Sequence, residues 1–143
     1  MRLTGFTLNL QELDPDFKVP KCFRKEKKIG TGAYGKVYEV THTASGEKFA
    51  IKRFEGLFKK ELRVQRLLRE MTILEKITHP CLNKCVAVIP PENFENFHEV
   101  YMVLDLCDMD MRKLLKSSKH LDEEQVKSIV YDILCGLKYL HKA

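Results

Sequence analysis

A glycine cluster followed by an alternating segment constrains this chain more than any other feature. The run from Gly30 to Val37 reads GTGAYGKV and has the spacing G-x-G-x-x-G-x-V. Glycines let a backbone turn tightly and approach phosphate oxygens without interference from a Cβ atom. Dinucleotide-binding folds share this spacing, but there the glycines open a helix. Residues Lys36–Val40 instead alternate between apolar and polar types, which predicts that the glycines join two strands.

The chain up to about residue 105 is predicted to form an antiparallel sheet with one long helix. Alternating segments with short, helix-free connections between the first three indicate antiparallel pairing. The predicted strands are Phe23–Ile29, Lys36–Val40, Lys48–Lys52, Leu82–Ile89 and Val100–Asp105. Apolar residues at three- and four-residue steps predict a helix over Lys60–Ile77, which ends before His79-Pro80.

The rest of the chain predicts an arm and two helices. Residues 1–21 contain Pro15 and Pro20 and are interpreted as an extended N-terminal arm. A short helix is expected over Met109–Lys116. A longer amphipathic helix is expected from near Asp122, where Gln125 is placed to complete a capping box. Its apolar stripe is Val126, Ile129, Val130, Ile133, Leu134, Leu137 and Leu140.

Composition excludes several classes of protein. The chain has 143 residues and a net charge of +5, which favours one domain with a mild charge. Its basic segments Lys21–Lys28 and Lys59–Arg69 are interrupted by acidic or apolar residues, so no nucleic-acid partner is expected. No apolar stretch approaches the roughly 18 residues of a membrane span, so no membrane partner is expected.

The cysteines favour a reducing compartment. Their number, five, is odd, and no signal-peptide core precedes them, so we expect reduced thiols in the cytoplasm or the nucleus. The pair Cys81 and Cys85 has a spacing that a metal site can use. It lacks a second pair of ligands, however, so these residues are expected to be buried thiols and no metal site is predicted.

A lysine and then a glutamate follow the glycine cluster along the chain. Lys52 ends the alternating segment Phe49–Lys52, and Glu70 lies in the middle of the predicted long helix. Either residue alone could be a solvated surface charge. Because an unpaired carboxylate near a buried edge is costly, Glu70 is expected to need a cation. Glycines, lysine and glutamate in this order resemble the nucleotide site of protein kinases, which implies that Lys52 and Glu70 form an ion pair.

These elements resemble those of eukaryotic protein kinases, and the chain is most similar to the mitogen-activated group. The resemblance covers residues from about 22 to 143. The segments that carry it beyond the lysine and glutamate are Gly32–Gly35, Arg66–Leu74, Val100–Asp110, Leu114–Lys116 and Gly136–His141. It implies an α+β fold in which residues 22–106 form an ATP-binding small lobe with a hinge. Residues 107–143 are then the start of a helical large lobe.

The resemblance also implies a role for each site residue. Leu104 would lie behind the adenine, with Ile29, Val37 and Ala50 above and below it. Backbone groups of the hinge at Asp105 and Cys107 would bind the adenine edge, while Asp110 and Lys113 would reach the ribose. The full ATP-binding set is Ile29, Gly30, Thr31, Gly32, Ala33, Tyr34, Gly35, Val37, Ala50, Lys52, Leu104, Asp105, Cys107, Asp110 and Lys113.

One further residue, Arg69, has two interpretations. It resembles an arginine that receives the phosphothreonine of the activation loop in this family, and a guanidinium suits a phosphate. A solvated arginine on a helix explains it equally well.

The activity that the resemblance implies is transfer of the ATP γ-phosphate to serine or threonine hydroxyls of protein substrates. ATP and Mg²⁺ would be required, and an upstream kinase is an expected partner. The motifs H-R-D and D-F-G, which orient the substrate and hold the metal, do not occur in the sequence. The chain alone is therefore expected to be inactive, with the Mg²⁺ ligands beyond Ala143. The alternative is a short, non-catalytic product that binds nucleotide or a partner.

Overall fold

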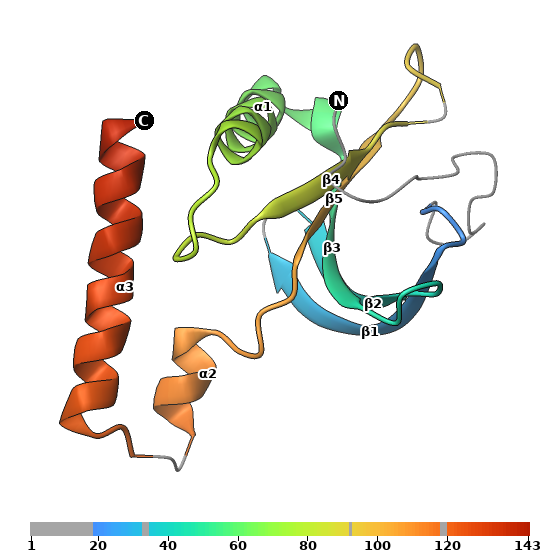
Figure 1. Ribbon diagram of the computed structural model, residues 1–143. Helices are drawn as coiled ribbons and strands as arrows, with labels where there is room; N and C mark the ends of the chain where they lie inside the picture. Colours follow the sequence, from blue (N-terminus) through green and yellow to red (C-terminus); the bar gives the residue numbers. More distant parts are fainter. Residues whose placement is uncertain (1–18, 33–34, 92, 118–119) are drawn as a thin grey trace.

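A five-stranded antiparallel sheet forms the first part of the molecule. The computed structural model describes residues 19–32, 35–91, 93–117 and 120–143. Its strands are β1 (Phe23–Gly32), β2 (Gly35–His42), β3 (Lys48–Glu55), β4 (Cys85–Ile89) and β5 (Glu99–Asp105). Their order in the sheet is β1-β2-β3-β5-β4, and every neighbouring pair is antiparallel. Figure 1 shows that the sheet is strongly curved. The predicted sheet is therefore confirmed.

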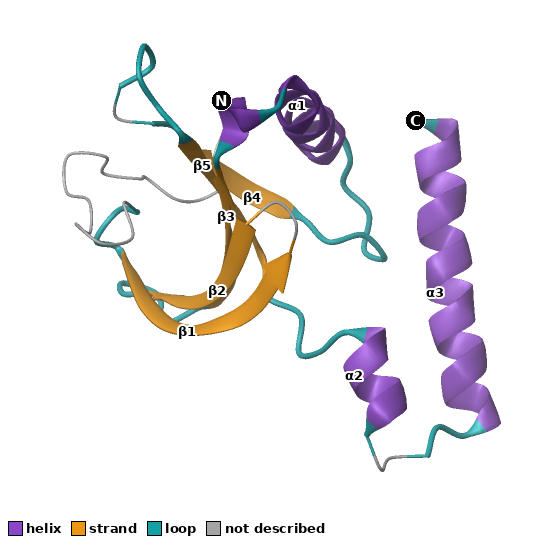
Figure 2. Ribbon diagram, turned by 180° about the vertical axis from the view of Figure 1, so that it is seen from behind, coloured by secondary structure: helices purple, strands orange, loops and turns teal. Residues whose placement is uncertain are grey.

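Helices flank this sheet and follow it. A short 3₁₀ helix, η1 (Leu57–Lys59), leads into α1 (Glu61–Lys76), and after β5 come α2 (Met111–Lys116) and α3 (Glu123–Lys142). Figure 2 shows α1 beside the sheet, with α2 and α3 separate from the strands. The structure is thus the expected α+β small lobe with one long helix, followed by the first helices of a second lobe.

Strands β1 and β3 each run three residues beyond their predicted ends, to Gly32 and Glu55. Two predicted starts are also wrong, and side-chain or turn hydrogen bonds explain both. The fourth strand begins at Cys85, not at Leu82, because the Leu82 N–H donates to the His79 carbonyl at 3.0 Å and closes a turn. The helix expected from Met109 begins at Met111, because the Asp110 carboxylate accepts a hydrogen bond from the Lys113 N–H at 2.7 Å. Such an N-cap fixes where a helix starts.

The capping box predicted for the last helix is present. The Gln125 N–H donates to the Asp122 carboxylate at 2.8 Å, and the Asp122 N–H donates to the Gln125 side chain at 3.1 Å. These two hydrogen bonds satisfy backbone N–H groups that have no partner within the helix at its start.

The sheet has a hydrophobic cluster on each face. One consists of Val19, Phe23, Val40, Phe49, Ile51, Val86, Ala87, Ile89, Tyr101 and Val103. The other packs α1 and η1 against the sheet through Phe54, Leu57, Leu67, Val100 and Met102. Val19 and Pro20 are fully buried, so the packed unit includes residues that the sequence assigned to the arm. The rest of the predicted arm, residues 1–18, lies outside the described residues.

Most of the apolar stripe of α3 is exposed in the part of the chain that the structure describes, while Ile129 and Leu140 are half-buried. Its members Val126, Val130, Ile133, Leu134 and Leu137 are exposed. In the part of the chain that the structure describes, no helix combines the length and the apolar character that a membrane crossing requires.

The difference in burial predicts a large loss of stability on truncating Met102 and a small one on truncating Leu134. Met102 is completely buried and Leu134 is 58% exposed. We expect Met102→Ala to lower the free energy of unfolding by about 2–5 kcal/mol, because it leaves a cavity between α1 and the sheet. Leu134→Ala should change it by less than about 0.5 kcal/mol. Urea unfolding followed by circular dichroism measures both, and equal losses would contradict the packing described here.

Candidate nucleotide-binding site

Strand β3 arranges the site because it pairs with a strand on each side. In this register Lys52 lies opposite Val37 of β2 and Met102 of β5. Two residues earlier, Ala50 lies opposite Glu39 and Leu104. Side chains opposite one another in an antiparallel pair point to the same face. One face of the sheet therefore collects residues from all three strands.

The expected ion pair joins this face to α1. The Lys52 ammonium Nζ lies 2.6 Å from Oε1 of Glu70. The same ammonium lies over the Phe54 ring, 4.6 Å from its centroid, which adds a cation–π attraction. Leu67, one turn before Glu70 on α1, packs in the same cluster as Met102. The salt bridge thus acts together with apolar packing to hold α1 against β3.

A cleft of about 880 Å³ opens where the sheet meets the segment after β5. This volume lies within the range of roughly 300–1,000 Å³ usual for small-molecule sites. Many residues predicted for ATP binding line it: Ile29, Gly30, Val37, Ala50, Leu104, Asp105, Cys107, Asp110 and Lys113. The sheet forms one wall, and residues between β5 and α2 form the other.

Other predicted residues do not line this cleft. Thr31, Gly32 and Gly35 belong to the far end of the β1–β2 hairpin, and Lys52 is directed to Glu70 instead. Ala33 and Tyr34, at the tip of the hairpin, lie outside the described residues.

Gly35 has a backbone conformation that requires glycine. Its φ is +149°, in the region that L side chains rarely adopt. A Cβ atom there would collide with the backbone carbonyl of Arg53 on β3. Gly32, by contrast, has open space where a Cβ atom would lie. The third glycine of the cluster therefore allows β2 to approach β3 closely.

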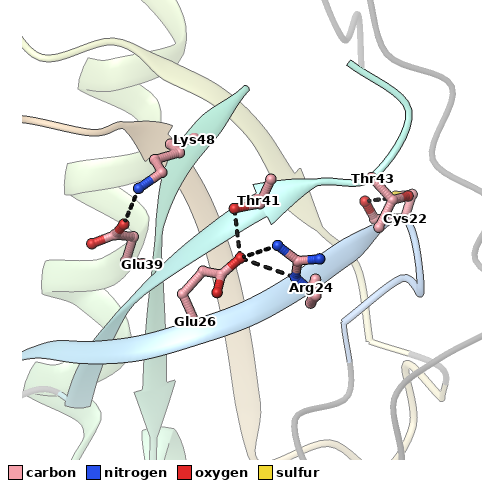
Figure 3. Close-up of polar contacts among 7 residues, drawn as sticks. All are labelled: Cys22, Arg24, Glu26, Glu39, Thr41, Thr43 and Lys48. Carbon is pink, nitrogen blue, oxygen red and sulfur yellow. Dashed lines mark hydrogen bonds and ion pairs between the residues drawn. The ribbon is translucent and has the colours of Figure 1, made fainter. Parts of the chain in front are cut away.

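Five charged residues of the cleft were missed by the sequence analysis, and three of them form one group around Glu39. Glu39 is nearly buried, with 7% of the residue exposed, and its carboxylate accepts from Lys48 at 2.9 Å and Lys27 at 3.2 Å (Figure 3 shows the Lys48 contact). Hydrogen bonds from Lys48 and then Lys27 lower the pKa of Glu39, and the same pairing raises the pKa of Lys48. Glu39 lies two positions after Val37, so strand alternation could have placed it on the same face.

A second polar group in Figure 3 ties β1 to β2. The Thr41 hydroxyl donates to Glu26 at 2.7 Å, and the Arg24 guanidinium donates to the same carboxylate oxygen at 3.0 and 2.9 Å. These bonds, first that from Thr41, lower the pKa of Glu26. The register of β1 shifts between Lys25 and Lys27, so Glu26 lies at a bulge of the strand.

Hydrogen bonds within the protein occupy some donors and acceptors of the segment between β5 and α2, so fewer of these groups can bind a ligand. The Asp105 N–H donates to the Lys84 carbonyl at 3.1 Å, so Asp105 can present only its carbonyl oxygen to an adenine edge. The Asp110 carboxylate caps α2 and lies 3.7 Å from the Lys113 ammonium. A ribose hydroxyl would therefore have to share Asp110 with these two partners.

Residues missed elsewhere along the cleft are Lys28, Asn83, Leu106, Asp108 and Met109. Asn83 comes from the turn before β4, which the sequence analysis had assigned to a strand. Asn83 lines the cleft because of how that turn packs. The pattern of apolar and polar residues around Asn83 does not predict this packing.

A smaller cavity, of about 420 Å³, lies between α1, the turn before β4 and α3. Arg66, Arg69 and Glu70 line its polar side, and Ile73 and Leu140 contribute to its apolar side. Arg69 therefore shares a cavity with Arg66, which is a second guanidinium that the sequence analysis did not assign to a site.

Cys81 and Cys85 are only partly buried, not fully buried as predicted. Burial nevertheless raises the pKa of both thiols. Among the described residues, no group of three or more His, Cys, Asp and Glu side chains converges on a point where a metal ion could bind.

Comparison with known families agrees with this geometry. The family model "Protein kinase domain" matches residues 23–143, which is most of the chain. The chain therefore belongs to the protein kinase family.

Several relatives of the chain are mitogen-activated protein kinases. The chain is 35% identical over 129 residues to mitogen-activated protein kinase 4a of Physcomitrium patens, covering 90% of this chain and 34% of the relative. It is 36% identical over 115 residues to mitogen-activated protein kinase 1 of Oryza sativa subsp. japonica, covering 80% and 29%. It is 34% identical over 128 residues to mitogen-activated protein kinase mpkA of Aspergillus fumigatus, covering 90% and 30%. The chain spans about a third of the length of these relatives.

Two glycine substitutions distinguish the effect of backbone strain on stability from the effect of replacing a glycine as such. Gly35→Ala combines an unfavourable φ with a backbone collision, and we expect it to lower the free energy of unfolding by roughly 2–5 kcal/mol. Gly32→Ala meets neither obstacle and should change it by less than about 1 kcal/mol. Denaturant unfolding of the two variants tests this, and a tolerated Gly35→Ala would mean that β2 does not approach β3 as described.

Proposed function

We propose that this chain is the ATP-binding part of a serine/threonine protein kinase of mitogen-activated type. The observation that carries the proposal is the Lys52–Glu70 ion pair at 2.6 Å, beside a cleft of nucleotide size. A kinase uses such a lysine to hold the α- and β-phosphates and the glutamate to fix the lysine. In the complete enzyme, the γ-phosphate would pass to serine or threonine hydroxyls of protein substrates.

The cleft supports a specific place for the adenine. Val37 and Ala50 lie on the sheet side, and Leu104 is opposite Ala50 on β5. A flat apolar ring inserted between these residues and the segment after β5 would meet the Asp105 carbonyl as an acceptor and the Cys107 N–H as a donor. Those two groups complement the amino group and the ring nitrogen of adenine.

The phosphates would then extend from the cleft toward Lys52. We expect the glycine hairpin between β1 and β2 to cover the phosphates, with its backbone N–H groups donating to their oxygens. The Lys52 ammonium would add charge while Glu70 keeps it from turning away. Asp110, with Lys113 beside it, is the proposed acceptor for a ribose hydroxyl.

Arg69 and Arg66 suggest how the complete enzyme is regulated. Both line the cavity beside Glu70. Two guanidinium groups in one cavity suit a doubly charged phosphate, and a phosphothreonine placed there by an upstream kinase would hold α1 and with it Glu70. This supports Arg69 as a phosphothreonine contact.

Metal is needed for phosphoryl transfer, where Mg²⁺ bridges phosphate oxygens and neutralises developing charge. The described residues hold no cluster of metal-ligating side chains, so they do not fit Mg²⁺. The sequence also lacks H-R-D and D-F-G. We therefore assign this chain nucleotide binding and positioning, and no chemical step.

Nucleotide binding should depend on Lys52. We expect Lys52→Ala to weaken the binding of ATP by roughly tenfold to a hundredfold, because a hydrogen bond to a charged group is worth about 1.5–3 kcal/mol. Lys127→Ala is the matched control, since Lys127 also pairs with glutamates but lies on α3, away from the cleft. Isothermal titration measures both dissociation constants. Equal affinities for the two variants would overturn the assignment of Lys52.

The chain should bind nucleotide without transferring phosphate. Incubated with radiolabelled ATP, Mg²⁺ and a basic protein substrate, the 143 residues are expected to give labelling no greater than a blank without protein. The physical reason is the lack of a group to orient the substrate hydroxyl and of ligands for the metal. Labelling that disappears in Lys52→Ala would show that the chain is itself an enzyme and that this assignment is wrong.

A further inference from the structure

The turn between α1 and β4 lies directly against α3. The His79 ring packs on the Tyr139 ring with a centroid separation of 5.0 Å. A Cβ atom placed on Gly136 would lie 3.1 Å from the Cys81 carbonyl oxygen and 3.1 Å from the Leu82 side chain. Glycine at this position of α3 therefore permits a close approach that a side chain would hinder.

Two cysteines meet in this contact. The Cys81 thiol lies 3.6 Å from the Asp132 carboxylate, and its Cβ atom lies 3.7 Å from where a Cβ atom of Gly136 would be. Positions 135 and 136 each follow Asp132 by about one turn, so both lie beside it on the helix surface. Cys81, which contacts Asp132 and Gly136, therefore lies close to Cys135, and charges on the two thiols would interact.

Both thiols are accessible to a small reagent. Cys81 and Cys135 are each only partly buried, and neither forms a disulfide in the structure. None of these residues lines the 880 Å³ cleft, so this contact is separate from the proposed nucleotide site.

We propose that Cys81 and Cys135 are a redox-sensitive pair that a hydroperoxide oxidises to a disulfide, fastening α3 to the turn between α1 and β4. One thiolate attacks the peroxide oxygen, forms a sulfenic acid and releases water or an alcohol. The second thiolate then attacks the sulfenic sulfur, forms the S–S bond and releases water. Two electrons pass from the thiols to the peroxide, and a dithiol reductant reverses the change.

Asp132 slows this reaction. Its carboxylate faces the Cys81 thiol, and a negative charge at that place disfavours the thiolate. Burial, followed by Asp132, raises the pKa of Cys81. The thiol that points to Asp132 must also turn toward Cys135 before the bond can close, since the two sulfur atoms of a disulfide lie about 2.05 Å apart. Removing the charge of Asp132 should therefore speed oxidation.

The disulfide would limit the motion of α1. The turn that holds Cys81 begins just after Lys76, the last residue of α1, and α1 carries Glu70. A covalent bond to α3 would fix the end of α1 relative to the second group of helices. The oxidation state of two thiols outside the cleft is thereby linked to the helix that supplies Glu70.

The test treats the 143-residue chain with hydrogen peroxide, blocks the remaining thiols and maps peptides by mass spectrometry without reduction. We expect a cross-linked peptide pair containing Cys81 and Cys135, lighter by two hydrogen atoms and lost on treatment with dithiothreitol. Cys135→Ser should abolish this species. The matched control is Cys107→Ser, which removes an exposed cysteine of the cleft and should leave the cross-link unchanged.

Two further measurements separate a native pair from random oxidation. Asp132→Asn should raise the rate of cross-linking roughly threefold for each pKa unit by which it lowers the pKa of Cys81, because the gain in thiolate exceeds the loss of nucleophilicity. In concentrated urea, wild-type chain should lose the preference for Cys81–Cys135. A preference that persists in urea, a dominant pairing of either cysteine with Cys22, Cys85 or Cys107, or oxidation to sulfinic acids alone would overturn the proposal.

Discussion

Strand β3 is the constraint on which the rest of the structure depends. It has a hydrogen-bonded neighbour on each side, β2 and β5, so its side chains must alternate between the two faces of the sheet. Ala50 and Lys52 go to the face that carries the cleft and α1, while Phe49 and Ile51 go into the opposite cluster. A shift of one residue in this register would exchange the two sets and place Lys52 in an apolar core.

The same constraint explains which parts of the fold could be predicted. Strands and α1 have clear periodicity in the sequence, and both were found within a few residues of their observed ends. The errors occurred where single hydrogen bonds decide, at the turn closed by Leu82 and the cap formed by Asp110. Nor could the pattern reveal that Val19 and Pro20 are buried, because burial depends on tertiary packing, such as that of Val19 in the cluster with Phe23.

In the nucleotide site, the sequence motifs identified those residues whose type is unusual for their predicted secondary structure. Glycines in a strand connection and a lysine in an apolar segment stand out, but Glu39 and Lys48 look like ordinary outward-facing charges. Their roles appear only when the register of the sheet brings the two side chains together beside the cleft, where the Lys48 ammonium lies 2.9 Å from the Glu39 carboxylate. A buried carboxylate then needs its lysines, since an unpaired charge there would be costly. Sequence alone cannot supply that pairing.

Helix α1 is held at two places by contacts of different kinds. In its middle, the Lys52–Glu70 pair and the packing of Leu67 attach it to the sheet. After its last turn, His79 and Cys81 contact α3. Both Lys52 and Glu70 are partly exposed, so their salt bridge is screened and contributes little stability by itself. The position of Glu70 therefore depends on packing at both places, and a change at the α3 contact can alter the geometry of the nucleotide site without touching it.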